Sequence, residues 1–321
     1  MKLLERVRQV LSRPRPPEQA AAEGEPAVLE MDFPACLARE FPAEFPAAQE
    51  ATMQVLAATA GADLEPLARN SPGLRGYAWS EYLTASLSRI VRAAGALRRF
   101  AAPGARVLDY GSYFGNFSLA LARLGYRVEA VDSYRTYGAA FAAVQDRLRV
   151  AGVEVLDFAE VGHGLKKLPA GSYDAVLAMG VIEHIPHTPR LFLEAVDRVL
   201  CGGGLLILDT PNLAYIYRRQ QLARGESIFC PIALQYHTEL PFEGHHREYT
   251  AAEVRWMLGQ LGHEELLLDL FVYSLLVQPR LQGQDLQNYR QCLRDPGCRE
   301  VIFSVSRKPA GRDRKVSESR S

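Results

Sequence analysis

The sequence predicts an α/β protein built on a doubly wound, mostly parallel sheet, with a helical cap preceding it. From residue 104 onward, short apolar runs of strand length alternate with amphipathic stretches of helical period. This alternation is typical of a parallel sheet with helices on both faces. Before that point, residues 31–100 carry apolar side chains at helical spacing, which predicts the cap.

The first 30 residues are predicted to stand apart from the fold. Residues 12–30 are rich in Pro, Ala and Glu without periodicity, which predicts a linker. Residues 1–11 form an amphipathic pattern with basic flanks. One interpretation is weak peripheral contact with a membrane, and the other is a short docking helix or a frayed terminus. Charges interrupt the apolar run, so we do not expect a signal peptide.

The predicted cap has two main helical stretches, 47–60 and 80–100, separated by the breaker sequence NSPGLRG. Three aromatic residues lie at the start of the second stretch, namely Tyr77, Trp79 and Tyr82. They are candidates for a lid over a ligand cleft, with ordinary helical packing as the alternative.

The sheet is predicted from a regular series of elements. Strands are expected over 105–110, 126–134, 153–158, 173–184 and 202–212, and helices over 116–125, 135–149 and 188–200. Thr188 is expected to cap the last of these helices, with Pro189 as its first residue. A helix over 250–262 opens with Thr250 and Glu253, the spacing of a capping box.

Two more strands, 264–274 and 299–309, are separated by a connection that shows no helical pattern. We therefore expect the last strand to insert antiparallel at the edge of the sheet. The polar stretch 309–321 is predicted to be a disordered tail. The predicted domains are thus residues 1–30, 31–100, 101–308 with an insert at 211–249, and 309–321.

The stretch VLDYGSYFGNF, residues 107–117, predicts a ligand loop between a strand and a helix. Gly111 permits a tight turn and Gly115 a close approach of the helix. Tyr113, after Ser112, stands where a dinucleotide loop needs a bare glycine. Asp109 is badly placed for a phosphate but suits a cation or an amine. A ligand with an adenosine and an amino-acid tail but no phosphates, such as S-adenosylmethionine, fits this loop.

Acidic residues also follow the next two predicted strands. Asp132, with Ser133 beside it, is suited to accept the hydroxyls of a ribose. Asp157 offers an acceptor for an adenine amino group, and Phe158 offers an apolar face for its ring. Parallel strands bring their carboxyl ends to one edge of a sheet, where ligands bind, so these residues are expected to form one site.

With these motifs in order, the chain resembles class I S-adenosylmethionine-dependent methyltransferases, in the group that includes quinone, small-molecule and sugar O-methyltransferases. The resemblance rests on LDYGSYFG, VEAVD, YDAVLAMGVIEHIPHTP, VLCGGGLLILDTPN and GHHREYTAAEV, and it covers residues 104–308. It implies a Rossmann-like fold, S-adenosylmethionine as cofactor, and Met179 and Gly180 lining its methionine side. The family loop usually has a glycine where this chain has Tyr113.

Methylation of a hydroxyl is helped by a general base, and histidine is the natural candidate. His184 follows the fourth predicted strand, beside Glu183, which is suited to orient it or to accept a hydrogen bond from the cofactor. His245 is the second candidate, from the long insert 211–249. The alternative for His184 is a structural role. A metal site from Glu183, His184 and His245 is conceivable, but the spacing does not demand it, and we expect none.

The expected acceptor is a small molecule, a sugar or a glycan precursor. Lys plus Arg and Asp plus Glu are both 37, giving zero net charge, which disfavours a nucleic-acid partner. A catalytically silent scaffold and an NAD-dependent oxidoreductase or epimerase remain as alternatives, although the latter would need glycines where Tyr113 and Asn116 stand. Five scattered cysteines and no apolar run of membrane length favour a cytoplasmic protein.

Overall fold

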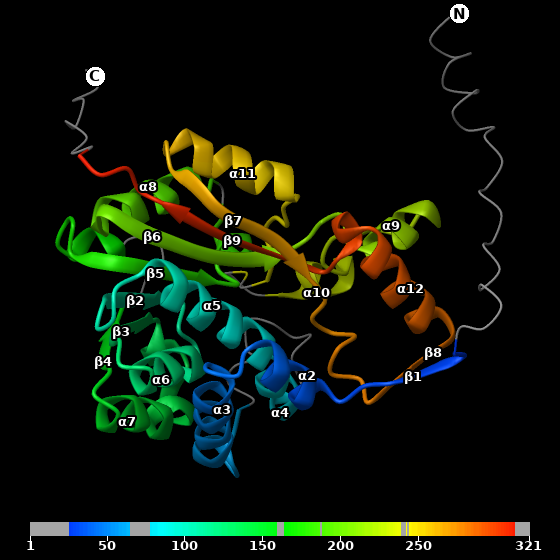
Figure 1. Ribbon diagram of the computed structural model, residues 1–321, viewed down its shortest axis with the longest axis horizontal. Coiled ribbons are helices and arrows are strands. Elements are labelled where there is room, and N and C mark those ends of the chain that lie inside the picture. The colour runs from blue at the N-terminus through cyan, green and yellow to red at the C-terminus, as the bar shows by residue number, and fades with distance from the viewer. Residues whose placement is uncertain are drawn as a thin grey trace, which may run out of the picture.

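The computed structural model describes residues 26–64, 78–158, 164–186, 188–238, 242 and 244–311 (Figure 1). The predictions made for residues 1–25, Tyr77 and 312–321 lie outside the described residues. None of the helices in the described part of the chain has the length and apolarity needed to cross a bilayer.

A seven-stranded mixed sheet forms the centre of the molecule, in the order β4-β3-β2-β5-β6-β9-β7. Its strands are β2 Arg106–Tyr110, β3 Arg127–Asp132, β4 Glu154–Asp157, β5 Tyr173–Met179, β6 Leu200–Pro211, β7 Glu264–Phe271 and β9 Val301–Arg307. The first five along the chain pair in parallel, and β9 is antiparallel to both of its neighbours. The predicted α/β class and the antiparallel last strand are confirmed. However, β9 lies between β6 and β7, so its predicted place at the edge was wrong.

Helices cover both faces of the sheet (Figure 1). One face carries α3 Phe45–Thr59, α5 Leu87–Phe100, α6 Asn116–Arg123 and α7 Ala142–Val150, and the other carries α8 Arg190–Val199 and α11 Ala251–Gln260. Side chains alternate between the faces along each strand. Within β2, for example, Val107 faces the first set of helices and Leu108 the second.

The predicted cap forms helices that pack into the first of these faces. It comprises α2 Phe33–Glu40, α3, α4 Trp79–Ala85 and α5. The predicted helix 80–100 divides at Ser86, whose hydroxyl donates to the Tyr82 carbonyl at 2.9 Å. Ile90 and Leu97 of α5 are fully buried in the same hydrophobic cluster as the strands. The N-terminal helices therefore share the main core.

The insert between β6 and α11 contains α9 Ile216–Ala223 and α10 Ile232–His237. Its two ends meet, because Asn212 forms a parallel bridge with Tyr249 and the Leu213 amide donates to the Tyr249 carbonyl at 2.9 Å. The insert thus leaves the sheet at the carboxyl end of β6 and returns to the same point before α11. The predicted capping box at Thr250 and Glu253 of α11 is present.

An accessory unit at one end of the sheet was not predicted. β1 Val28–Glu30 pairs antiparallel with β8 Arg280–Gln282, and α12 Gly283–Arg294 follows. The prediction of a linker through residue 30 was therefore wrong at β1. The prediction of a non-helical connection before the last strand was also wrong, because Leu286, Tyr289 and Cys292 give α12 a narrow apolar face within a polar sequence.

Two helix starts also differ from the predictions. α8 begins at Arg190 with Pro189 as its N-cap, one residue later than expected, and Thr188 Oγ1 accepts from the Arg190 amide at 3.3 Å. The predicted helix 135–149 opens as two short 3₁₀ segments before α7. Within the described residues, the 3₁₀ segments are η3 Tyr134–Thr136, η4 Gly138–Phe141, η5 Gly164–Lys167, η6 Ile182–His184 and η7 Pro296–Cys298.

Candidate active site

The candidate site lies at the carboxyl ends of β2 to β6. After β2 the chain winds outward to β3 and β4, and then returns to place β5 on the other side of β2. This reversal is the point at which open α/β sheets bind ligands. The strand register brings the predicted residues together there, since Asp132 is the partner of Asp157, and Met179 the partner of Asp209.

The loop between β2 and α6 is tightly wound. Gly111, Tyr113 and Gly115 have φ angles of 74°, 46° and 69°. A Cβ atom on Gly111 would lie 2.6 Å from Val181 Cγ2, and one on Gly115 would lie 2.8 Å from Leu148 Cδ1. Both glycines are therefore required by backbone conformation and by space. Tyr113 adopts the left-handed conformation despite its side chain.

The ring of Tyr113 lies in an aromatic cluster. Its centroid is 4.5 Å from Phe114, 5.4 Å from Tyr137 and 5.9 Å from Trp79. Tyr82 is also in contact, at 6.3 Å. The lid candidates Trp79 and Tyr82 therefore do reach the loop. Ser112 is fixed beside them, because its hydroxyl is 2.7 Å from the Tyr134 hydroxyl and 3.2 Å from the Val131 carbonyl.

Asp132 ties the loop to the end of β3. Its Oδ2 accepts from the Tyr113 amide at 2.7 Å, and its Oδ1 accepts from the Ser133 amide at 2.7 Å and from the Tyr137 hydroxyl at 2.9 Å. Burial raises the pKa of Asp132 above its usual value. Each carboxylate oxygen can accept about two hydrogen bonds, so Oδ2 retains room for one more donor.

Asp109 is a buried acid under the loop. Its Oδ2 accepts from the Ser118 hydroxyl at 2.5 Å. Burial raises the pKa of Asp109 to about 6, with a further contribution from the charge of Asp132. This carboxylate therefore carries a charge at neutral pH with little solvent to stabilise it, which favours a nearby cationic group.

Asp157 has one oxygen in use and one free. Its Oδ2 accepts from Arg135 Nε at 2.9 Å, while its buried Oδ1 accepts no hydrogen bond within the described part of the chain. A buried acceptor without a donor is costly, and a ligand amino group would satisfy it. Phe158 follows, with Lys167 Nζ 5.6 Å from its ring centre.

Arg89 and Asp209 are residues of this site that the sequence did not single out. Arg89, on α5, donates from Nε and Nη2 to the two carboxylate oxygens of Asp209 at 2.7 and 2.6 Å. Burial alone would lower the pKa of Arg89, but the pairing with Asp209 holds it well above its usual value. Arg89 is one of four arginines in the predicted helix 80–100, so no signal in the sequence distinguishes it from the others.

Gly180 lies directly over this pair, next to the buried Met179. Its φ is 66°, and a Cβ atom there would lie 2.7 Å from Arg89 Nη2. The Gly180 amide donates to the Asp209 carbonyl at 3.1 Å. The turn after β5 is thereby fixed against α5 and β6.

Beyond this turn, the structure brings Glu183, His184 and His245 together. One ligand atom from each of these side chains lies within 4.8 Å of the other two, and the two histidine rings meet edge to face with centroids 4.8 Å apart. The backbone joins the two segments, because the Glu183 carbonyl accepts from the His246 amide at 2.7 Å. The three residues, which could hold a metal ion, are called the Glu–His–His cluster below.

The cluster is oriented by further residues that the sequence did not identify. Thr210 Oγ1 donates to Glu183 Oε2 at 2.9 Å. His245 Nδ1 is 2.9 Å from Glu248 Oε1, which also accepts from Arg218 Nη2 at 2.8 Å. Burial raises the pKa of Glu183 to about 7. Burial alone would lower the pKa of His245, but Glu248 and Glu183 raise it.

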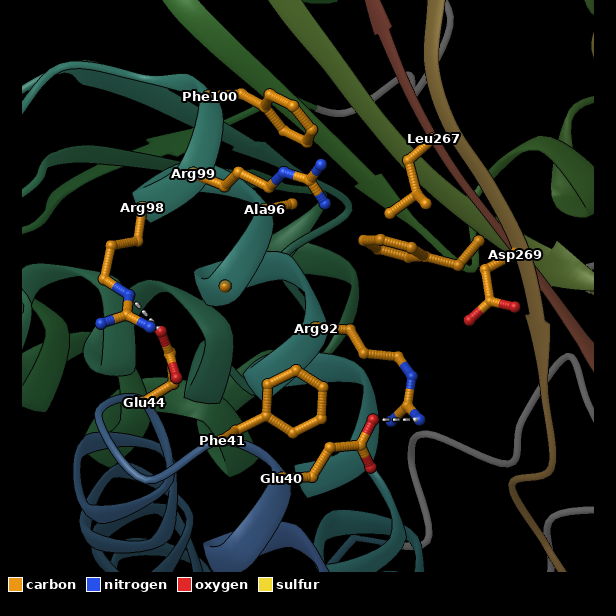
Figure 2. Close-up of a pocket in the computed structure, with 12 residues that line it drawn as sticks. Glu40, Phe41, Glu44, Arg92, Ala96, Arg98, Arg99, Phe100, Leu267 and Asp269 are labelled. Atoms are coloured by element: carbon orange, nitrogen blue, oxygen red, sulfur yellow. Dashed lines mark ion pairs between the residues drawn. The ribbon is translucent and has the colours of Figure 1, made fainter.

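The cavity in Figure 2 is a separate feature between α5, the end of α2 and the edge of the sheet. Arg98 pairs with Glu44 at 2.6 Å, and Arg92 with Glu40 at 3.6 Å. Its lining includes none of the strand-end residues described above. His237 also lies apart from the cluster, on α10, against Tyr236.

Comparison with known protein families decides the assignment. The model of a family described as "Methyltransferase domain" matches residues 79–267, the region that contains the strand-end site. The chain belongs to this methyltransferase family. The match is to a class I, S-adenosylmethionine-dependent methyltransferase domain, so the sequence-based resemblance is confirmed.

Curated relatives of this methyltransferase include ubiquinone biosynthesis O-methyltransferases. The protein of that name from Xanthomonas campestris pv. campestris (strain B100) is 38% identical over 120 residues, 36% of this chain and 46% of the relative. Its counterpart from Caulobacter sp. (strain K31) is 37% identical over 112 residues, 34% of this chain and 42% of the relative. The alignments thus span less than half the length of these relatives.

Solved structures of methyltransferases are also similar, at a lower level. The 1,6-didemethyltoxoflavin-N1-methyltransferase of Burkholderia thailandensis has a TM-score of 0.46 and 14% identity, covering 75% of this chain and 87% of that one. An S-adenosylmethionine-dependent methyltransferase of Methanosarcina mazei has a TM-score of 0.46 and 16% identity, covering 67% and 97%. At these scores the likenesses add no argument.

Proposed function

We propose that this protein transfers a methyl group from S-adenosylmethionine to a hydroxyl of a small molecule, a sugar or a glycan precursor. The observation that carries the proposal is the meeting of three acids, Asp109, Asp132 and Asp157, with the Glu–His–His cluster at one strand-end edge. The family match and the similarity to ubiquinone biosynthesis O-methyltransferases support it.

The residues present fit the cofactor in its chemistry. Asp157 Oδ1 is a buried acceptor that receives no hydrogen bond from the described residues, and the adenine amino group would supply one. Asp132 Oδ2 has capacity for a ribose hydroxyl. Asp109 offers negative charge to the ammonium of the amino-acid tail. The absence of a glycine at Tyr113 suits a ligand without phosphates, which argues against a dinucleotide.

When bound, S-adenosylmethionine supplies an activated methyl group on a sulfonium leaving group. The chain then has to hold the acceptor oxygen in line with that methyl carbon, about 3–3.5 Å away, and to exclude water. We propose that the aromatic cluster around Tyr113 covers the cofactor and that the Glu–His–His cluster receives the acceptor.

The histidines of the cluster can take the proton of the acceptor hydroxyl. The bond from His245 Nδ1 to Glu248 fixes the ring and leaves Nε2 for this task. His184, whose ring meets that of His245 edge to face, is the second candidate for the base. Removing the proton as the C–O bond forms contributes typically 10²–10⁴-fold to such reactions.

The insert 211–249 is proposed to select the acceptor. It supplies His245 and Glu248 and carries Arg218, which pairs with Glu248, so polar groups of the insert contact the cluster. An acceptor that is rich in hydroxyls or anionic would match these side chains. The five cysteines are all free thiols, which supports a proposed location in the reducing cytoplasm.

The test is a calorimetric titration with S-adenosylhomocysteine. We expect the wild-type protein to bind it and Asp132→Asn to weaken binding by tenfold or more, about 1.4 kcal/mol. Asp174→Asn is the matched control, because Asp174 lies at the start of β5, at the opposite end of that strand from the site. There it accepts from the Arg106 amide at 2.8 Å. Wild-type protein that binds NAD and not S-adenosylhomocysteine would refute the proposal.

The role of the histidines is separable from cofactor binding. His184→Ala and His245→Ala are expected to retain affinity for S-adenosylhomocysteine and to lose methyl transfer to hydroxylated acceptors such as catechols and hexoses. A methyltransferase-like scaffold would bind the cofactor and show no turnover with any variant.

A further inference from the structure

The Glu–His–His cluster has the donor set of a metal centre, and we propose that it binds one divalent transition-metal ion on the acceptor side of the site. Ion binding stands on Glu183, His184 and His245 alone. The role we give the ion, holding and acidifying the acceptor hydroxyl, rests on the proposed function. With the ion bound, this role replaces that of the histidines as direct bases, because their nitrogens then hold the metal. This proposal replaces the expectation from the sequence that the site holds no metal.

The spacing of the three side chains is close to that of a ligand shell. The ligand atoms lie within 4.8 Å of one another. Metal–nitrogen and metal–oxygen distances of about 2.0–2.2 Å place tetrahedral ligands roughly 3.3–3.5 Å apart. Side-chain rotations that close the gaps by at most about 1.5 Å therefore complete the shell. The backbone bond from His246 to Glu183 already holds the two segments in register.

The electrostatics of the cluster favour a cation. Glu183 is only 2% exposed, and Oε2 of its carboxylate is held by the neutral hydroxyl of Thr210. Burying a carboxylate is costly unless a positive charge or a metal compensates it. The two histidine rings, which are exposed at the mouth of the site, can supply neutral nitrogen ligands without adding charge.

The surroundings of His245 are those of a ligand residue. Its Nδ1 is bonded to Glu248 Oε1 at 2.9 Å, which fixes the ring and leaves Nε2 as the nitrogen that can bind a metal ion. Arg218 fixes Glu248 in turn at 2.8 Å. Metal-binding histidines almost always donate their second nitrogen to a carboxylate or carbonyl in this way. Thr210 plays the corresponding part for Glu183.

The donor set selects the kind of ion. Two imidazole nitrogens and one carboxylate oxygen suit borderline ions such as Zn²⁺ or Co²⁺ better than Mg²⁺, which prefers oxygen ligands. Three protein ligands leave coordination positions open, as in catalytic metal sites. An acceptor hydroxyl that binds there loses its proton to solvent water more readily. The acceptor oxygen then takes the methyl group, and the electron pair of the C–S bond stays on sulfur.

The experiment uses the full-length protein without a histidine tag, stripped of metal by a chelator. The visible absorption of bound Co²⁺ monitors a titration with that ion, and calorimetry monitors a titration with Zn²⁺. We expect one ion per chain. His184→Ala and His245→Ala should each weaken binding by at least tenfold, and Glu248→Gln by about tenfold, within the 10- to 100-fold range for residues that orient ligands.

His246→Ala is the matched control, because it is adjacent to His245 in sequence and its ring contacts the Phe242 carbonyl. It should bind Co²⁺ as the wild type does. Circular dichroism checks that each variant is folded, and Glu183→Gln, which retains the shape of the side chain, provides a second test if an alanine variant unfolds. The proposal is overturned if the wild type binds no stoichiometric ion, or if His245→Ala and Glu183→Gln bind with wild-type affinity.

S-adenosylhomocysteine titrations on the same samples separate the two proposals. Cofactor binding without metal binding would overturn the metal site and leave the histidines as direct bases. Metal binding without cofactor binding would support the metal site and refute the proposed methyl transfer.

Discussion

Asp109 is an acid of the proposed cofactor site whose charge changes between about pH 5 and pH 7. Its pKa is raised to about 6 by burial, and the nearby Asp132 raises it further while Ser118 and Arg89 act in the opposite direction. Above that pH the side chain is a carboxylate that can pair with the ammonium of the cofactor. Below that pH it is neutral, and the pairing is lost.

We therefore predict that affinity for S-adenosylhomocysteine is full above about pH 7 and falls as the pH drops below 6, by up to about tenfold per pH unit. Calorimetric titrations from pH 5 to 8 measure this dependence. Asp109→Asn should bind more weakly at pH 8 and show a flatter profile. An unchanged pH profile in this variant would assign the dependence to another group.

At the scale of single residues, the sequence identified acids better than it identified their partners. Asp109, Asp132 and Asp157 each end an apolar strand, a local pattern that predicts one shared edge, and the structure brings them together. Arg89 could not be placed in the same way, since its partner Asp209 lies 120 residues further along the chain. The sequence around Arg89 gives no local indication that Asp209 is its partner, and the sequence around Asp209 gives none of Arg89.

At the scale of elements, the loop from β2 to α6 depends on contact as well as backbone conformation. Gly111 and Gly104 have nearly the same φ, 74° and 73°. A Cβ on Gly111 would lie 2.6 Å from Val181 Cγ2, whereas one on Gly104 would have nothing within 4 Å. Comparing the same substitution at Gly111 and at Gly104 therefore separates the cost of steric crowding from the cost of backbone strain.

Gly104→Ala is predicted to cost about 1–2 kcal/mol, from the left-handed backbone alone. Gly111→Ala should cost more by at least about 1 kcal/mol, because overpacking adds to that strain. Chemical denaturation gives both free energies of unfolding. Equal losses in the two variants would mean that Val181 moves aside freely.

Elements with strong periodicity were predictable, and those with polar sequences were not. The strands of the sheet and the capping box of α11 follow directly from apolar runs and from Thr250 and Glu253. α12 was missed because its buried face is narrow and is completed by Tyr217 of α9 and by Tyr215, the residue before that helix. β1 was missed because three residues next to a Pro- and Ala-rich stretch carry little local signal, and their pairing with β8 is long-range.

At the scale of the whole molecule, the Arg89–Asp209 pair joins the N-terminal helices to the central strands. It links α5 to β6 at the floor of the site, and Asp209 is fully buried. Replacing one partner leaves the other charge buried without compensation, which is strongly destabilising.

Arg89→Met is therefore predicted to lower the free energy of unfolding by about 3–5 kcal/mol. The double variant Arg89→Met/Asp209→Asn should lose clearly less than the sum of the two single variants, because it removes both charges. Urea denaturation of all four proteins completes the cycle. Strict additivity would show that the pair contributes no coupling.

The bridge between Asn212 and Tyr249 has a consequence for how such a protein could diversify. A segment whose two ends touch can be exchanged for another of different length or composition without moving the strands that flank it. Replacement of the insert 211–249 would then change the preference for the acceptor while the cofactor-binding part of the protein stays the same. Laboratory grafting of the corresponding segment from a relative offers the same route to altered substrate choice.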